Sequence, residues 1–239
     1  MEMTTQEIER RNAATWRARL APYVTPDLRR SVLQLVSAAV LFAGAWALMY
    51  ASLAVSYWLT LVLAVPTAFL LIRLFIIQHD CGHGSFFRSG RTAELVGSIL
   101  GVLTLTPYHF WKKSHAIHHA TNGNLEHRGF GDIKTLTVDE YFALSRWERF
   151  KYRVYRHPVV LFGIGAVLQF FVVYRIPTMI PRTWTRERRS ILWTDVGLAV
   201  VIVVMGSLVG FRALLLVHLP VALLSTSIGV WLFYVQHQF

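Results

Sequence analysis

Histidines crowd into one part of this sequence, and their spacing favours metal binding. Seven of the ten lie between residues 79 and 127, and five of these form the motifs HDCGH and HAIHH. The five stand at helical spacings of three and four: His79 and His83, then His115, His118 and His119. Such spacings put side chains on one face of a helix. Because neutral imidazole binds zinc, copper, iron and nickel, the two motifs together predict a metal site rather than helix caps or solvated histidines.

The number of imidazoles indicates more than one metal ion. A structural zinc takes four ligands, whereas the two motifs offer five. Soluble di-iron bundles use Glu-x-x-His, a pattern that this sequence lacks, so an all-imidazole dimetal centre is the alternative. Within the first motif, Asp80 is placed to accept a hydrogen bond from a ligand imidazole and fix its tautomer. Cys81, the only cysteine, is expected to be a small buried space-filler rather than a redox thiol.

The elements that position these motifs are membrane helices. The chain is 54% hydrophobic and 15% charged, well below the charged quarter that is typical of soluble domains. No Asp, Glu, Lys or Arg occurs from residue 31 to 72 or from 213 to the end, and a spanning helix needs about 20 apolar residues. The net charge of +11 is better explained by cytoplasmic loops facing anionic lipid than by nucleic-acid binding.

Four segments are long enough to cross the membrane: 32–54, 57–77, 191–210 and 213–235. Two shorter apolar segments, 95–106 and 159–174, are flanked by Lys and Arg at both ends. If neither crosses, all 24 Lys and Arg except Arg212 lie on one side, which the positive-inside rule makes cytoplasmic. The sequence therefore predicts an all-α integral membrane protein with four spanning helices, two interfacial or re-entrant helices and a cytoplasmic histidine-rich cap. We expect one domain over 1–239, with both termini cytoplasmic.

The stretches HDCGHGSFF and WKKSHAIHHATNGNLEHRGFGDIKTLTVDEY resemble two histidine motifs of the membrane-bound fatty acid desaturases, most of all bacterial and plastid acyl-lipid omega-6 (delta-12) enzymes. The closing GVWLFYVQHQF is similar to the end of their last spanning helix. The resemblance implies that a non-haem di-iron centre is held by His79, His83, His115, His118 and His119, with His237 as a further ligand.

The resemblance has one departure. The family carries another H-x-x-H-H motif beyond its last spanning helix, whereas this sequence ends at Phe239. The six histidines fall short of a complete two-iron ligand set. We therefore expect a fragment of a longer protein that is inactive by itself.

If the resemblance holds, the reaction is oxygen-dependent desaturation of a lipid-linked acyl chain at the iron centre, with O2 as co-substrate. The protein would lie in the bacterial inner membrane. A cytoplasmic ferredoxin or cytochrome would supply electrons, docking on the basic face. A carotenoid or alkane hydroxylase or ketolase with the same histidine motifs is the alternative enzyme. A haem-binding membrane electron carrier is the alternative of another class, and it would use single histidines at membrane depth.

Two further histidines have expected roles. His109 lies six residues before the second motif and is a candidate for the layer of residues around the ligands. His218 falls in the middle of segment 213–235, where we expect it to hydrogen-bond a neighbouring helix rather than do chemistry.

Overall fold

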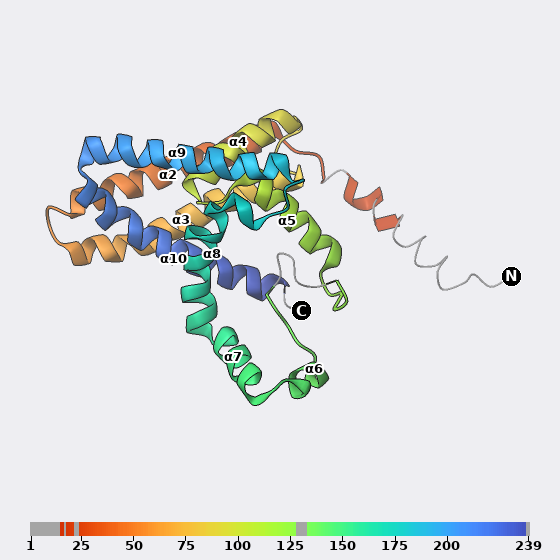
Figure 1. The fold of residues 1–239 in the computed structure, drawn as a ribbon. Coiled ribbons are helices and arrows are strands. Elements are labelled where there is room, and N and C mark those ends of the chain that lie inside the picture. The colour runs from red at the N-terminus through yellow and green to blue at the C-terminus, as the bar shows by residue number, and fades with distance from the viewer. Residues whose placement is uncertain (1–14, 17, 22–23, 128–132, 238–239) are drawn as a thin grey trace.

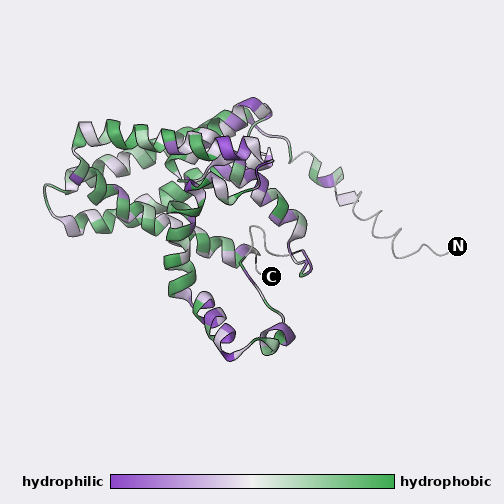
Figure 2. Cartoon of the chain, in the orientation of Figure 1, coloured by the Kyte–Doolittle hydropathy of each residue, from purple (hydrophilic) through white to green (hydrophobic). Residues whose placement is uncertain are grey.

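The fold is all-helical, and its four longest helices match the four predicted spans. The computed structural model describes residues 15–16, 18–21, 24–127 and 133–237. Within them, the helices long and apolar enough to cross a membrane are α2 (Leu28–Ser52), α3 (Tyr57–His83), α9 (Thr185–Val209) and α10 (Phe211–His237). They lie side by side as a bundle (Figure 1), and apolar residues run along their length (Figure 2). The multi-pass membrane architecture expected from the sequence is confirmed.

Helix α3 is the centre of the bundle, packed against α2, α4 and α10. Its contact with α2 uses small residues, with Ala38, Ala64 and Ala68 fully buried. A hydrogen bond of 2.7 Å between the hydroxyls of Ser52 and Thr60 fastens the two helices near their short connection. Small residues and shared hydroxyl bonds are the usual means of helix association where lipid replaces water.

The first histidine motif extends α3 beyond the predicted span. The sequence places the end of the apolar segment at residue 77, and the helix continues to His83. It ends there because Gly84 takes a left-handed conformation, φ 71°, that favours glycine and forms the C-cap. HDCGH is therefore the last turn and a half of a membrane helix, which fixes the direction of both histidines.

The second histidine motif lies on α5 (Tyr108–Thr121), which is joined to α4 (Gly90–Leu103) by a tight turn. Neither helix is among the candidate spans, as expected for segment 95–106. In the turn, Leu105 has φ 57°, an uncommon conformation for a residue with a branched side chain. The contacts that hold this turn matter for the site, because α5 starts directly after it.

The remaining short helices form an arm and its return to the bundle. Helices α6 (Val138–Ala143) and α7 (Arg146–Arg156) make the arm, which projects from the bundle across the direction of the long helices (Figure 1). Segment 159–174 then forms the π-helix η2 (Val159–Gly165), α8 (Ala166–Phe171) and the 3-10 turn η3 (Val173–Arg175). The η2–η3 segment is bent by 67° from α7, as in a broken span or re-entrant loop. A second 3-10 turn, η4 (Pro177–Met179), leads into α9.

Candidate metal centre

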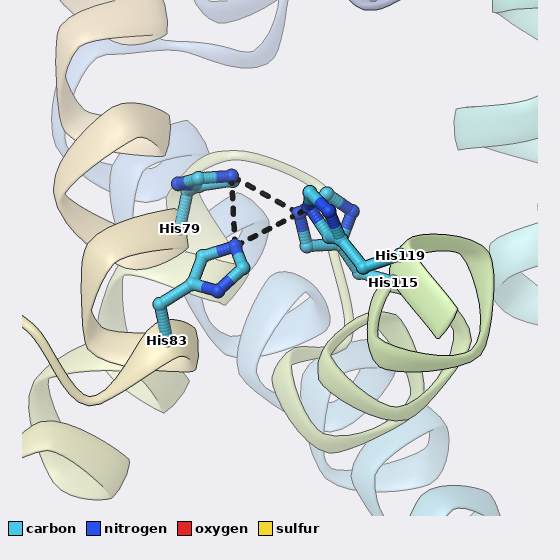
Figure 3. A group of neighbouring side chains, drawn as sticks. All are labelled: His79, His83, His115 and His119. Carbon is cyan, nitrogen blue, oxygen red and sulfur yellow. Dashed lines mark hydrogen bonds between the residues drawn. The ribbon is translucent and has the colours of Figure 1, made fainter. Parts of the chain in front are cut away.

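Four imidazoles from α3 and α5 converge on one point at the end of the bundle. Figure 3 shows His79 and His83 on one helix facing His115 and His119 on the other. The Nε2 atom of His115 lies 3.0 Å from that of His79, 3.1 Å from that of His83 and 3.0 Å from that of His119. The Nε2 atoms of His79 and His83 are 3.2 Å apart. His115 is therefore the central residue of the cluster, and it is 8% exposed.

These separations fit a metal ion. Imidazole nitrogens bound at about 2.0–2.1 Å in right-angled or tetrahedral positions lie about 2.9–3.4 Å apart. The donor set is also chemically consistent, because the four ligand atoms lie within 4.8 Å of one another and all are imidazole nitrogens. The Nε2 atoms of His79, His83 and His115 lie within 3.2 Å of one another. Because the Nε2 of a neutral ring either donates or accepts, hydrogen bonds cannot satisfy all three of these contacts. A central cation satisfies all of their lone pairs at once.

Asp80 lies within hydrogen-bonding distance of one candidate ligand. Its Oδ1 lies 3.1 Å from Nδ1 of His79, so the carboxylate accepts the Nδ1–H hydrogen bond. The proton on Nδ1 leaves the Nε2 lone pair of His79 directed into the cluster. Carboxylate partners of this kind orient ligand imidazoles and raise their basicity. The geometry supports the expected role of Asp80, which stays a prediction.

The ring of Trp111, a residue outside the two histidine motifs, covers one side of the cluster. The Trp111 ring stacks on His115 at 4.6 Å between centroids and lies 5.5 Å from His79. Gly82 makes room for it, because a Cβ atom there would lie 2.8 Å from the Trp111 ring. The signal was present in the sequence: Trp111 stands four residues before His115 on the same helix, and glycine interrupts HDCGH. Together they exclude water from one side of the imidazoles.

His118 faces a different direction from its two neighbours in the motif. It is 2% exposed, and its ring lies 5.0 Å from that of Phe233 on α10. Successive helical residues diverge by about 100°, so adjacent His118 and His119 do not share one direction. The expectation that all three histidines of HAIHH point the same way therefore holds for His115 and His119 only. A ligand role for His118 stays a prediction, and the side chain of His237 lies outside the described residues.

The other two histidines considered from the sequence lie elsewhere. The backbone N–H of His109 donates to Ser190 Oγ on α9 at 3.1 Å. The ring of His218 packs edge-on against Trp46 of α2, 4.4 Å between centroids. Within the described residues, His218 Nε2 has no hydrogen-bond partner, so the expected bond to a neighbouring helix is absent. Cys81 is fully buried in the helix core, as expected for a space-filler.

Two long side chains fix the turn between α4 and α5. From α3, the fully buried Gln78 donates to the Thr106 carbonyl at 3.2 Å and accepts from the Thr104 hydroxyl at 2.6 Å. From η3, Arg175 donates to the Leu105 carbonyl at 2.7 Å, satisfying a backbone group that the left-handed residue exposes. The turn is thereby tied to the same helix that carries His79, and these contacts set the position of α5 relative to α3.

Ion pairs hold the outer surface of α4 and α5 against the start of α9. Lys113 lies 3.1 Å from Glu187, and Arg186 lies 2.8 Å from Glu94. The Lys113 ammonium also stands 4.1 Å above the Trp184 ring. The helix that carries the second histidine motif is therefore held from both α3 and α9.

The half-buried His109 is expected to make the fold sensitive to acid. Burial lowers the pKa of His109 below its usual 6.5, and the Arg186 and Lys112 charges lower it further, against Glu94 and Glu187. The unfolded chain then binds this proton more tightly. The stability due to neutral His109 is thus complete above about pH 6.5 and is lost as pH falls through the folded pKa. We expect melting temperature to fall less between about pH 7.5 and about pH 5.5 in His109→Gln than in the wild type. Equal falls in thermal melts would contradict this.

Apolar helices that end in clustered imidazoles define a multi-pass membrane protein with a candidate metal centre at the end of its helix bundle. The chain belongs to the fatty acid desaturase family, whose profile matches residues 56–239. A Bacillus subtilis fatty acid desaturase is 44% identical over 220 residues, which are 92% of this chain and 62% of that protein. The chain thus spans less than two thirds of the length of this relative.

Shorter matches come from plants and cyanobacteria. An endoplasmic reticulum omega-3 fatty acid desaturase of Vigna radiata is 49% identical over 53 residues, 22% of this chain and 14% of that protein. A Synechocystis sn-1 acyl-lipid omega-3 desaturase (ferredoxin) is 45% identical over 53 residues, 22% of this chain and 15% of that protein. The family resemblance expected from the histidine motifs is confirmed.

Proposed function

We propose that the protein acts in the oxygen-dependent desaturation of a lipid-linked fatty acyl chain at a non-haem di-iron centre. The observation that carries the proposal is the convergence of four imidazole Nε2 atoms from α3 and α5 at the end of a membrane helix. An alkyl C–H bond has no acidic proton, so side-chain acid–base chemistry cannot start the reaction. Iron with O2 supplies the oxidising chemistry when bound.

The residues of this chain hold and shield that chemistry. His79, His83, His115 and His119 would hold iron. Asp80 would keep the proton of His79 on Nδ1, and Trp111 with Phe75 would exclude water. The rings of Trp111 and Phe75 meet edge to face, 5.5 Å between centroids. A site at the end of the bundle suits a substrate whose headgroup stays at the interface while its tail enters between the helices.

We propose that His118 and His237 serve the second iron. The His118 ring contacts Phe233, which precedes His237 by four residues on α10. His118 therefore faces α10, the helix that carries His237, whereas His79 and His83 lie on α3. The one-domain organisation over 1–239 remains a prediction.

The side of the membrane, the electron donor and the bond position are further parts of the proposal. The Lys and Arg distribution supports a cytoplasmic cluster in a bacterial inner membrane, reduced by a ferredoxin or cytochrome. The name of the Synechocystis relative includes ferredoxin. The omega-6 (delta-12) position suggested by the motif sequences stays a prediction, and two relatives matched over 53 residues are named omega-3 desaturases.

Product analysis tests this function. We expect a chimera of residues 1–239 and the C-terminal remainder of the Bacillus subtilis relative to produce new unsaturated fatty acids in a host, measured by gas chromatography and mass spectrometry of its lipids. The same chimera with His115→Ala should yield none, and the double-bond position distinguishes omega-6 from omega-3 products. Hydroxylated products, or no product from a chimera that is folded and loaded with iron, would contradict the proposal. The 239-residue chain expressed alone is expected to be inactive and to yield no new unsaturated fatty acid in the same measurement.

A further inference from the structure

A groove between α6 and α7 combines an apolar half with a basic half. Two open cavities of about 380 Å³ and about 280 Å³ adjoin there, and both are lined by Tyr141 and Arg153. The larger includes apolar side chains of Leu136, Val138 and Phe142. The smaller is lined otherwise by Arg146 and Arg149 alone. No residue lines both this groove and the histidine cluster.

No acidic residue that the structure describes forms an ion pair with the arginines of the basic half of the groove. Among the residues that the structure describes, Arg146, Arg149 and Arg153 make no ion pair or hydrogen bond through their side chains. The nearest acid in sequence, Glu148, is engaged in a capping box with Ser145, which lowers the pKa of Glu148. Three guanidinium groups around one cavity form a site for a planar or tetrahedral oxyanion, above all a phosphate.

One exposed stripe of α7 is apolar. Trp147, Phe150 and Val154 are spaced by three and four residues and are 64%, 48% and 41% exposed. At about 100° per residue they form one stripe, beside the arginines and away from Tyr152. The Tyr152 hydroxyl instead accepts from the Leu136 backbone N–H at 3.2 Å, on the side of α7 that faces the preceding segment. A helix with an aromatic stripe flanked by Arg is typical of one lying in the membrane interface.

The position of the arm fits that interface. Helix α7 is joined to the bundle through the 67° bend and runs across the direction of the spanning helices (Figure 1). Arg156 at its end donates to the Tyr234 hydroxyl of α10 at 2.9 Å, close to where α10 ends. The arm is thus held at the end of a spanning helix, at the level where lipid headgroups lie.

We propose that the α6–α7 groove binds an anionic phospholipid, with its phosphate between Arg146, Arg149 and Arg153 and its glycerol and upper acyl carbons against Leu136, Val138 and Phe142. The bound lipid anchors the arm in the interface, at a site that shares no residue with the histidine cluster. The two halves match an amphiphile, whereas the basic half alone would fit any acidic partner.

Lipid retention by the full chain tests this site. The protein is reconstituted in nanodiscs of phosphatidylcholine with phosphatidylglycerol as the minor lipid, released into detergent, and the lipids that stay bound are identified by native mass spectrometry. We expect phosphatidylglycerol to be enriched over its share in the nanodisc by about fivefold, the scale of one arginine contact at a membrane surface. The triple variant Arg146→Gln, Arg149→Gln, Arg153→Gln should lose the enrichment.

A matched control removes the same charge elsewhere. Arg91, Arg182 and Arg189 are exposed and lie outside the groove, so their triple replacement by Gln should retain the enrichment. Equal loss in both triple variants would reduce the effect to overall charge and overturn the proposal. The proposal would also be overturned if the triple α7 variant kept the phosphatidylglycerol enrichment but bound an acidic ferredoxin more weakly. The arm would then dock the electron donor. Melting temperatures in detergent check that both variants are folded.

Discussion

Replacing His115 by alanine lowers the affinity of the cluster for iron by more than about 100-fold, since even partners outside the ligand shell cost 10–100-fold when removed. His115 Nε2 lies 3.0–3.1 Å from the Nε2 atoms of His79, His83 and His119. Its loss therefore removes the α5 nitrogen that lies within 3.1 Å of both α3 histidines. The measurement is iron per chain in purified protein, followed by titration of the metal-free protein with Fe²⁺.

The control for this variant is His127→Ala. His127 is exposed and lies outside the four-histidine group, so its replacement should leave iron binding at the wild-type level. Circular dichroism establishes that His115→Ala keeps its helices. A folded His115→Ala protein that binds iron as tightly as the wild type would show that the cluster is not the metal site.

Replacing Arg175 by alanine destabilises the protein and loosens the cluster without touching it. The guanidinium lies 2.8 Å from Asp195 Oδ1 and donates to the Leu105 carbonyl at 2.7 Å. Removing it leaves a carboxylate unpaired on a spanning helix and a carbonyl without its donor. We expect a cost of about 2 kcal/mol, below the 3–5 kcal/mol of a fully buried pair because the Asp195 side chain is 32% exposed.

Two readouts separate the parts of this effect. The melting temperature in detergent should fall by about 2–4 °C for each kcal/mol of lost stability. The double variant Arg175→Ala, Asp195→Asn should regain part of this loss. Iron affinity should fall in both variants, because the contact with the Leu105 carbonyl is missing from each. Arg182→Ala, an exposed arginine near the start of α9, should change neither quantity. Unaltered iron affinity in folded Arg175→Ala protein would mean that the turn does not position α5.

Much of this architecture is predictable because it depends on local patterns. Uninterrupted apolar runs predict α2, α3, α9 and α10, since each must satisfy its backbone within itself in lipid. Spacing by four predicts that His79 pairs with His83, and Lys and Arg flanks predict that 95–106 and 159–174 are not ordinary spans. Helix ends are less predictable: α3 runs six residues beyond the apolar segment because a glycine, not the change in polarity, ends it.

What could not be predicted depends on contacts between residues far apart in the sequence. Gln78 of α3 and Arg175 of η3 both bond to the turn at 104–106, and no periodic pattern links those three places. The left-handed Leu105 has no sequence signature, because a leucine takes this conformation only when its surroundings impose it. His118 illustrates a different limit: a shared motif does not mean a shared direction, since one residue of helical offset turns its ring toward α10.

X-ray absorption at the iron edge tests most directly whether iron binds to imidazole nitrogens between α3 and α5. The wild-type protein loaded with Fe²⁺ should show a first shell of nitrogen at about 2.1 Å with the outer-shell scattering of imidazole rings, and His115→Ala should lose that signature. A first shell of oxygen without imidazole scattering, or an unchanged spectrum in His115→Ala, would contradict the account.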